Sequence, residues 1–133
     1  MGLDDGGESW NSLLEGIDLE QPVGMLNQLK FHDTAQYEPD SGEEPCTGAE
    51  AFGRYGAAIT PILKEMGAGV FLNRIAELIG PQREWDMTFV VRYRRARDLL
   101  DMVRSERYRA IIHHRTAAVA DSRLLMMRFT GDQ

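Results

Sequence analysis

The sequence contains a single cysteine, no long hydrophobic run and none of the short motifs that mark the common enzyme classes. One cysteine, Cys46, excludes a disulfide within the chain and is typical of a reducing compartment. No stretch approaches the ~20 apolar residues that a membrane helix needs. The acidic first ten residues do not resemble a signal peptide. We therefore expect a cytoplasmic protein without a membrane partner.

The motifs that would place a metal or a phosphate group are also missing. The histidines and carboxylates show no HExxH or comparable metal spacing. A glycine-rich phosphate loop and a GxSxG nucleophile elbow are absent as well. From the sequence we therefore expect no metal and no bound cofactor. The length of 133 residues fits one domain.

Charge is unevenly distributed along the chain. Residues 1–50 hold twelve acidic residues and one lysine, whereas residues 92–128 hold ten arginines and four acidic residues. A basic segment can bind nucleic acid, but no aromatic residues alternate with these arginines as a base-stacking surface requires. We expect no nucleic-acid partner. The acidic and basic segments would instead face each other, within the chain or across a dimer.

Hydrophobic periodicity and turn residues divide the chain into an arm and one domain. Residues 1–21 resemble a loosely held arm, and the domain extends over residues 22–131. The Thr-x-x-Glu spacing of Thr47 and Glu50 predicts a helix with a capping box, which Pro61 should kink or loosen. The expected elements are strands at 22–31, 69–80, 84–93 and 122–129, a helix at 47–66, and a helix at 94–103 that continues or restarts after Ser105.

This order, β-α-β-β-α-β, predicts an α+β fold: a ferredoxin-like antiparallel sheet with helices on one face. Both faces of the expected strand at 84–93 carry apolar residues, so the face without helices also needs a cover. A second copy of the chain is the simplest cover, and we predict a homodimer. The acidic loop at residues 32–47 is long for a compact domain and is a candidate lid or mobile segment.

Helical phase separates the polar residues of the stretch RSERYRAIIHHR at 104–115. At about 100° per residue, Arg115 falls within about 40° of Tyr108, together with Ile112. His113 then points nearly opposite and His114 to one side, which predicts two solvated histidines that do not form a pair. Tyr108 and Arg115 are expected to face inward.

A buried arginine needs an acceptor, because an unpaired guanidinium in the interior is costly. The partner of Arg115 could be structural, either Asp86 or helix-end carbonyls, and this is the favoured interpretation. It could also be a substrate carboxylate or enolate, which the planar guanidinium binds well. The other candidate catalytic residues are Tyr108, Tyr55 and Asn27 as hydrogen-bond donors, and His32 and Asp86 for proton transfer. Each also has a structural interpretation, as a core residue or a solvated loop residue.

Four segments, VGMLNQLKF, AFGRYGAAITPIL, WDMTFVVRY and LLDMVRSERYRAIIHHRTAAVADSRLL, together resemble a bacterial family known only as domain of unknown function thirteen-thirty. The resemblance extends from about Val23 to Phe129. It implies membership of the dimeric α/β-barrel superfamily, in which two ferredoxin-like sheets pack face to face and each subunit has a cavity. Relatives there include cofactor-free monooxygenases, muconolactone isomerases and haem-degrading enzymes.

Three functions are consistent with these observations. The first is a small-molecule enzyme that performs oxygenation, isomerisation or proton transfer in the barrel cavity without a bound cofactor. The second is a non-catalytic module that binds a metabolite or a protein. The third, haem handling, requires a histidine inside the cavity, which the helical phase disfavours. A titratable group in contact with Arg115, or in contact with a tyrosine hydroxyl, would favour the first function, the enzyme.

Overall fold

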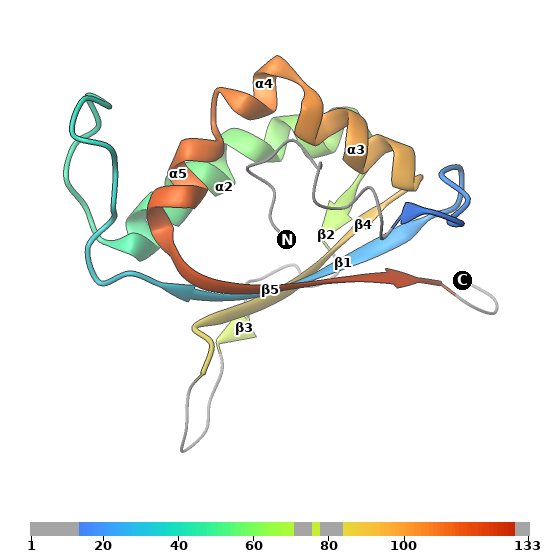
Figure 1. The fold of residues 1–133 in the computed structure, drawn as a ribbon, viewed down its shortest axis with the longest axis horizontal. Helices are drawn as coiled ribbons and strands as arrows, with labels where there is room; N and C mark the ends of the chain where they lie inside the picture. Colours follow the sequence, from blue (N-terminus) through green and yellow to red (C-terminus); the bar gives the residue numbers. More distant parts are fainter. Residues whose placement is uncertain (1–13, 71–75, 78–83, 130–133) are drawn as a thin grey trace.

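The computed structural model describes residues 14–70, 76–77 and 84–129, which form an antiparallel sheet with helices on one face (Figure 1). The strand order is β2-β4-β1-β5, and β3 also pairs with β4. The strands are β1 (Val23–Phe31), β2 (Gly69–Val70), β3 (Ala76–Glu77), β4 (Met87–Tyr93) and β5 (Val119–Arg128), and the helices are α2 (Gly48–Glu65), α3 (Ala96–Arg104), α4 (Glu106–Arg109) and α5 (Ile112–Ala118).

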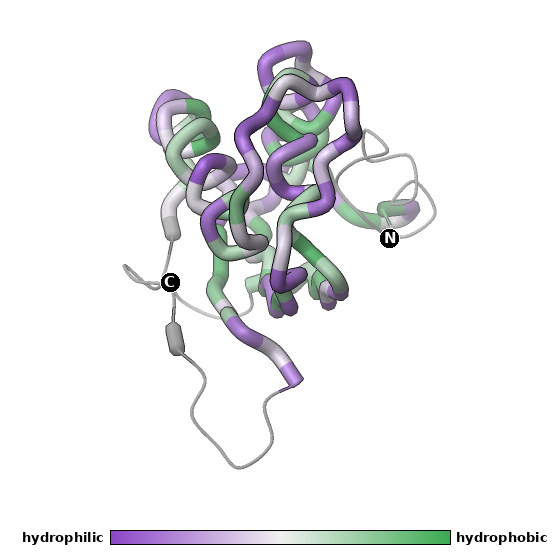
Figure 2. The backbone as a smooth tube through the Cα atoms, turned by 90° about the vertical axis from the view of Figure 1, so that its left-hand side faces the viewer, coloured by the Kyte–Doolittle hydropathy of each residue, from purple (hydrophilic) through white to green (hydrophobic). Residues whose placement is uncertain are grey.

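The two central strands have the alternation that the sequence predicts. In β1, Val23, Met25 and Leu29 are buried beneath the helices. Strand β4 lies antiparallel to β1, and its Val91 and Tyr93 are buried on the same face. The helices are amphipathic as well: in Figure 2, stretches coloured hydrophobic and hydrophilic follow one another along each helix. One shared core therefore lies between the sheet and the helices.

The strand expected at residues 69–80 is described only at β2 and β3. Both pair antiparallel with the same edge of β4, Gly69 opposite Arg92 and Ala76 opposite Thr88. Residues 71–75 and 78–80 lie outside the described residues. The two described pieces are consistent with the predicted strand position beside β4.

Helix α2 begins where its capping box predicts. The Thr47 side chain accepts a hydrogen bond from the Glu50 backbone N–H at 3.1 Å, and the Glu50 carboxylate accepts one from the Thr47 N–H at 3.0 Å. The next residue is Gly48, and a larger residue would not fit there because its Cβ would collide with the backbone oxygen of His32. This close approach fixes the start of α2 against the end of β1. The helix continues through Pro61 as one element.

The second helical region, expected to continue or restart after Ser105, consists of three helices. Ser105 ends α3 and caps α4, because its side chain accepts a hydrogen bond from the Tyr108 N–H. The predicted restart after Ser105 is thus confirmed. A further break follows at Ala110 and Ile111, where α4 ends and α5 begins. The regular helix is therefore interrupted between Tyr108 and Arg115.

The described part of the predicted arm, residues 14–21, is attached and not loosely held. Leu14 is buried in the core. The backbone oxygen of Gln21 accepts a hydrogen bond from Ala96 at the start of α3, and Glu20 forms ion pairs with two arginines of that region. The expectation of a loose arm is corrected for these residues. The division of the chain at residue 22 stays a prediction.

The acidic loop at 32–47 is fastened along its length to neighbouring helices. The Gln36 N–H donates to the Ala117 oxygen at 2.8 Å, and the Ala35 N–H donates to the Cys46 oxygen at 2.9 Å. From α2, Arg54 donates to the Glu44 oxygen at 3.1 Å. The loop therefore lies against α2 and α5, and its movement as a lid stays a prediction.

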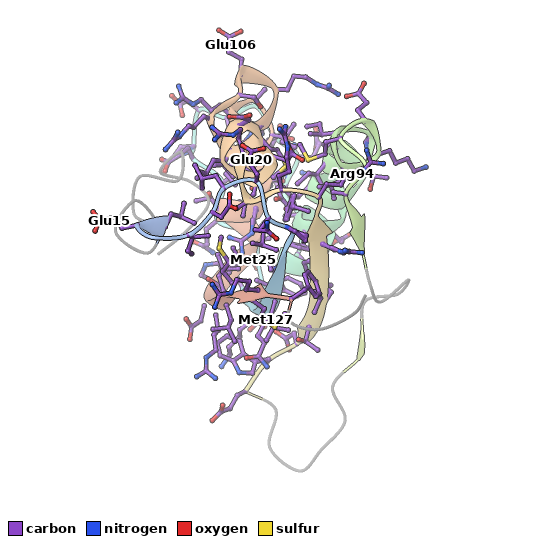
Figure 3. The ribbon with its side chains drawn as sticks, turned by 90° about the vertical axis from the view of Figure 1, so that its right-hand side faces the viewer. Glu15, Glu20, Met25, Arg94, Glu106 and Met127 are labelled. Atoms are coloured by element: carbon purple, nitrogen blue, oxygen red, sulfur yellow. The ribbon has the colours of Figure 1, made fainter. Side chains whose placement is uncertain are left out.

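The face of the sheet opposite the helices carries exposed apolar side chains. Leu125 of β5 is 51% exposed, and Met127 projects from the same face, away from the helices (Figure 3). Leu26 and Val90 lie opposite each other on this face and are half-buried. The α+β, ferredoxin-like architecture predicted from the sequence is confirmed. Among the described residues, no helix is long and apolar enough to cross a membrane.

Candidate functional site

A cavity of about 180 Å³ lies between α2 and the helix-facing side of β1 and β4. Most of its wall is apolar, because α2 and the two strands each present their core-facing stripe to it. Four lining residues carry polar groups on their side chains: Asn27, Tyr55, Thr60 and Tyr93. An apolar cavity with a few polar groups is the usual form of a small-molecule site.

Two tyrosines form a hydrogen-bonded pair at this cavity. Tyr55 of α2 lines it, and its hydroxyl lies 2.7 Å from that of Tyr108, which is fully buried. The rings meet edge to face, with centroids 6.2 Å apart. One hydroxyl donates to the other, so the accepting tyrosine keeps its own hydrogen for another partner.

Burial governs the ionisation of these tyrosines. It raises the pKa of Tyr55 and, together with the neighbouring Tyr55 group, that of Tyr108. It also raises the pKa of Tyr93. All three side chains are therefore neutral O–H donors near pH 7, suited to donate a hydrogen bond to negative oxygen and not to act as bases.

Arg115 of α5 supplies a positive charge close to these hydroxyls. Its charge opposes the rise in pKa of Tyr55, Tyr93 and Tyr108. The side chain is 7% exposed, which confirms the predicted inward orientation. The expected structural partner is not found: Nη2 is buried without a hydrogen-bond acceptor among the described residues. An uncompensated buried charge costs several kcal/mol, so this guanidinium is poised for an anionic partner.

Asn27 is the polar residue that interrupts the apolar face of β1. It is 5% exposed, lines the cavity, and donates from Nδ2 to the Met25 backbone oxygen at 3.1 Å. This bond fixes the orientation of the amide, as a core residue requires. Of the six candidate residues, Asn27 and Tyr55 line the cavity, Tyr108 bonds to Tyr55, and Arg115 lies close enough to both tyrosines for its charge to act on them.

His32 and Asp86, the two candidates for proton transfer, do not line the cavity. The backbone of His32 bonds to Ala118 and Gly48, joining the end of β1 to the helices. Asp86 accepts a hydrogen bond from the Phe31 N–H through Oδ2 at 2.9 Å. The geometry therefore gives both residues a role in closing the end of the sheet.

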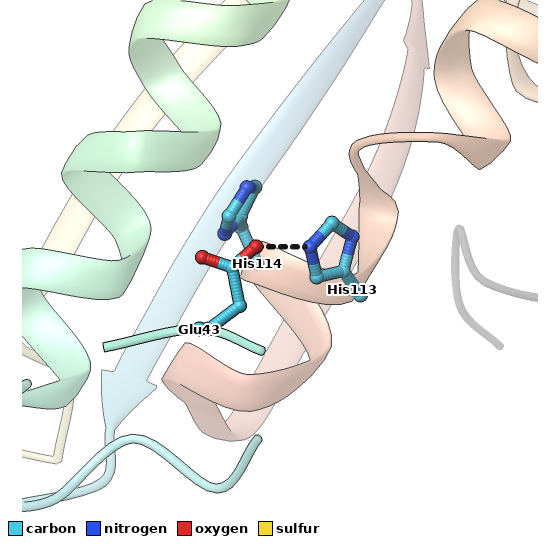
Figure 4. Close-up of side chains that lie close together, drawn as sticks. All are labelled: Glu43, His113 and His114. Carbon is cyan, nitrogen blue, oxygen red and sulfur yellow. Dashed lines mark hydrogen bonds and ion pairs between the residues drawn. The ribbon is translucent and has the colours of Figure 1, made fainter. Parts of the chain in front are cut away.

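Sequence reasoning overlooked Tyr93, although the alternation of β4 places it beside Tyr55 in the core. It also misplaced the adjacent histidines. The rings of His113 and His114 lie together, with centroids 4.0 Å apart, and Glu43 of the acidic loop faces both (Figure 4). The prediction that they are not a pair is wrong: adjacent helix positions differ by about 100°, yet both side chains turn toward the Glu43 carboxylate.

The histidine cluster has the side-chain chemistry of a cation site. The His113 Nε2 lies 3.1 Å from Glu43 Oε1, and this hydrogen bond lowers the pKa of the Glu43 carboxyl. Burial, and then the neighbouring His113, lower the pKa of His114. The three side chains offer ligand atoms within 4.8 Å of one another. None of the three lines the cavity.

Comparison with known proteins places the chain among proteins of unknown function. It is 32% identical to the RPA0582 protein of unknown function from Rhodopseudomonas palustris, with a TM-score of 0.77 and coverage of 94% of this chain and 95% of that one. The methylated RPA0582 protein gives 32% identity, a TM-score of 0.78, and coverage of 93% and 92%.

A dimeric protein of unknown function with a ferredoxin-like fold, from Bacteroides fragilis, shares the fold alone. It has 10% identity, a TM-score of 0.54, and coverage of 81% of this chain and 96% of that one. No curated protein matches the chain. The sequence matches the family described as Domain of unknown function (DUF1330) over residues 43–129, a shorter range than the expected start at Val23. The chain therefore belongs to the DUF1330 family.

Proposed function

We propose that the chain is a small-molecule enzyme that binds a compact carbonyl or phenolic compound and stabilises negative charge on its oxygen. The observation that carries this proposal is the buried pair of hydroxyls, Tyr55 and Tyr108, beside a guanidinium whose Nη2 has no acceptor among the described residues. Buried donors arranged before reaction act most strongly on charge that develops at oxygen.

The size of the cavity supports a ligand of about one ring. A dry apolar cavity of about 150 Å³ can hold a benzene molecule, and the cavity here measures about 180 Å³. Aromatic and aliphatic walls from Phe52, Ile59 and Phe89 suit a ring or a short branched chain. The polar end of the ligand would lie toward Tyr55.

The chemistry follows from the donors. A carbonyl compound that gives up an α-proton to hydroxide from solvent becomes an enolate, and a phenol that gives up its proton in the same way becomes a phenolate, with water as the other product. In either case the charge rests on oxygen, where the spare O–H of the tyrosine pair can donate and Arg115 can attract. Isomerisation, proton transfer and cofactor-independent oxygenation all proceed through such an anion.

A non-catalytic binding module is the second candidate, and one observation favours it. No carboxylate or imidazole lies among the cavity-lining residues in the described part of the chain. A ligand that is already anionic could therefore bind to the same donors without being converted.

Hydrogen exchange into a ketone distinguishes the two candidates. Cyclohexanone in deuterium oxide exchanges its α-protons, and proton NMR follows the rate. The enzyme should exceed the buffer rate, and Tyr55→Phe should reduce the excess by about 10²-fold, the typical effect of losing one oxyanion donor. Oxygen uptake with a one-ring phenol tests the oxygenase reaction in parallel. If the protein binds these compounds but accelerates neither the exchange nor the oxygen uptake, the binding module is favoured.

We also propose that two copies of the chain pair through the sheet face opposite the helices. This face carries the exposed Leu125 and the half-buried Met127 in a strand whose other face is packed. Contiguous exposed apolar surface usually marks an interface. The dimeric Bacteroides fragilis protein with the same fold adds support.

A further inference from the structure

We propose that Glu43, His113 and His114 form a binding site for a divalent transition-metal ion of the zinc type, which fastens the acidic loop to α5. The proposal does not depend on the function of the cavity. It rests on the convergence of two imidazoles and one carboxylate from segments that are 70 residues apart in sequence.

The arrangement of the three side chains fits one shared ion. Their ligand atoms all lie within 4.8 Å of one another, and Glu43 Oε1 is 3.1 Å from His113 Nε2. Bonds from zinc to nitrogen or oxygen are about 2.0–2.2 Å long, so ligand atoms around one ion are separated by roughly 3–4 Å. A small inward rotation of the exposed side chains would complete this geometry. Figure 4 shows the carboxylate facing both rings.

A second layer of contacts orients His114 for this role. The Tyr37 hydroxyl lies 2.7 Å from His114 Nδ1, and Arg54 donates to the same hydroxyl oxygen at 3.3 Å. An oxygen that accepts from Arg54 has a second lone pair for the N–H of Nδ1. His114 then keeps a free lone pair on Nε2, and metal-binding histidines are commonly held in this way.

The donor set selects the class of ion. Two imidazoles and one carboxylate are the ligands of many three-residue zinc sites, with water in the fourth position. Calcium and magnesium prefer oxygen ligands alone. Arg54 lies 3.6 Å from Glu43 Oε2, so its positive charge opposes the ion and should keep the affinity moderate.

The position of the site assigns it a structural role. His113 and His114 lie in the first turn of α5, the helix that also carries Arg115, whereas Glu43 belongs to the loop. None of the three lines the cavity. A shared ion would therefore tie the loop to the helix that positions Arg115.

The test is isothermal titration of Zn²⁺ into the full-length chain, prepared without a histidine tag and stripped with chelator. We expect one zinc ion per chain. His113→Ala, His114→Ala and Glu43→Gln should each weaken binding at least tenfold. The chain supplies matched controls: His32→Gln removes the only other histidine, Glu44→Gln changes the adjacent carboxylate, and both should bind zinc like the parent.

Circular dichroism establishes whether each variant is folded. If a histidine variant does not fold, Glu43→Gln still tests the site, because glutamine preserves the shape of the glutamate side chain. Cobalt(II) provides an independent readout, because its visible absorption reports the ligand set. If all three variants bound zinc as tightly as the parent, the proposal would be overturned. It would also be overturned if the two control variants lost as much zinc affinity as the three variants. Absence of binding to the parent would overturn it as well and leave the cluster as a hydrogen-bonded contact between loop and helix.

Discussion

Replacing Arg115 by methionine should stabilise the ligand-free protein, although it removes the central charge of the candidate site. The guanidinium is 7% exposed and its Nη2 has no acceptor among the described residues. Leaving a buried donor unsatisfied costs about 1–3 kcal/mol, and more for a charged group. Methionine removes this cost and keeps a side chain of similar length in the core.

The magnitude can be compared with that for Arg115→Ala. Alanine also removes the unsatisfied donor, but it deletes two further buried methylenes at about 0.8 kcal/mol each. The two effects roughly cancel, so Arg115→Ala should leave stability nearly unchanged. Arg115→Met should increase the free energy of unfolding by about 1–3 kcal/mol. Urea slopes for small proteins are about 1–3 kcal/mol per molar, so the unfolding midpoint should rise by roughly 1 M.

Urea denaturation followed by circular dichroism measures this change. Parent and variants are compared at equal protein concentration, because the proposed dimerisation would make stability depend on concentration. Arg109→Met, at an exposed arginine of α4, is the matched control and should leave the midpoint within error. A loss of about 3–5 kcal/mol in Arg115→Met would be the result of breaking a buried ion pair. That outcome would refute the reasoning and assign Arg115 a structural partner.

Three further results are expected. Leu125→Glu should turn the proposed dimer into a folded monomer in light scattering, and a variant that is still a dimer would exclude this face as the interface. Burial raises the pKa of Tyr55, Tyr93 and Tyr108 above 10.0, so their stabilising effect is complete below pH 10 and declines above it. The fourth tyrosine, Tyr37, is half-buried. Tyrosinate absorbance of the other three should therefore rise with alkaline unfolding, less so in each Phe variant, and a rise before unfolding that these Phe variants reduce would contradict their burial. Thr47→Ala should cost about 0.5–2 kcal/mol in urea denaturation through loss of the helix cap, whereas an unchanged midpoint would show that the capping box is dispensable.

Local patterns predicted the parts of the fold that depend on neighbouring residues. The alternation of β1 and β4 placed Met25 and Val91 on the core face, where both are buried. The spacing of Thr47 and Glu50 placed the start of α2 to within one residue. These signals are visible because each element buries one face and the helix cap is chemically specific.

The break between α4 and α5 could not be predicted from local sequence patterns. Ala110 and Ile111 include neither proline nor glycine, so no local signal ends the helix there. Beyond the break, α5 packs against α2. Tyr108 and Arg115 nevertheless both face inward, as the continuous helix predicted. The two histidine rings meet although adjacent helix positions differ by about 100°.

The candidate site was predictable only in part for the same reason. Tyr55, Tyr108 and Asn27 stood out because polar groups on apolar stripes must face the core. The cluster of Glu43 with His113 and His114 joins a loop to a helix, and no spacing in the sequence encodes that contact. Long-range contacts of loops depend on how the whole chain packs.

Binding of benzoate, compared with benzamide, tests most directly whether Arg115 and the tyrosine pair form an oxyanion site. The two compounds share one ring and nearly the same shape, and only benzoate carries a charge. A charge-assisted hydrogen bond contributes about 1.5–3 kcal/mol, so calorimetry should show benzoate binding to the parent roughly 10–100-fold more tightly. Arg115→Met should abolish this preference, and Arg109→Met should keep it. Equal affinity of the parent for both compounds, or an unchanged preference in Arg115→Met, would contradict the account.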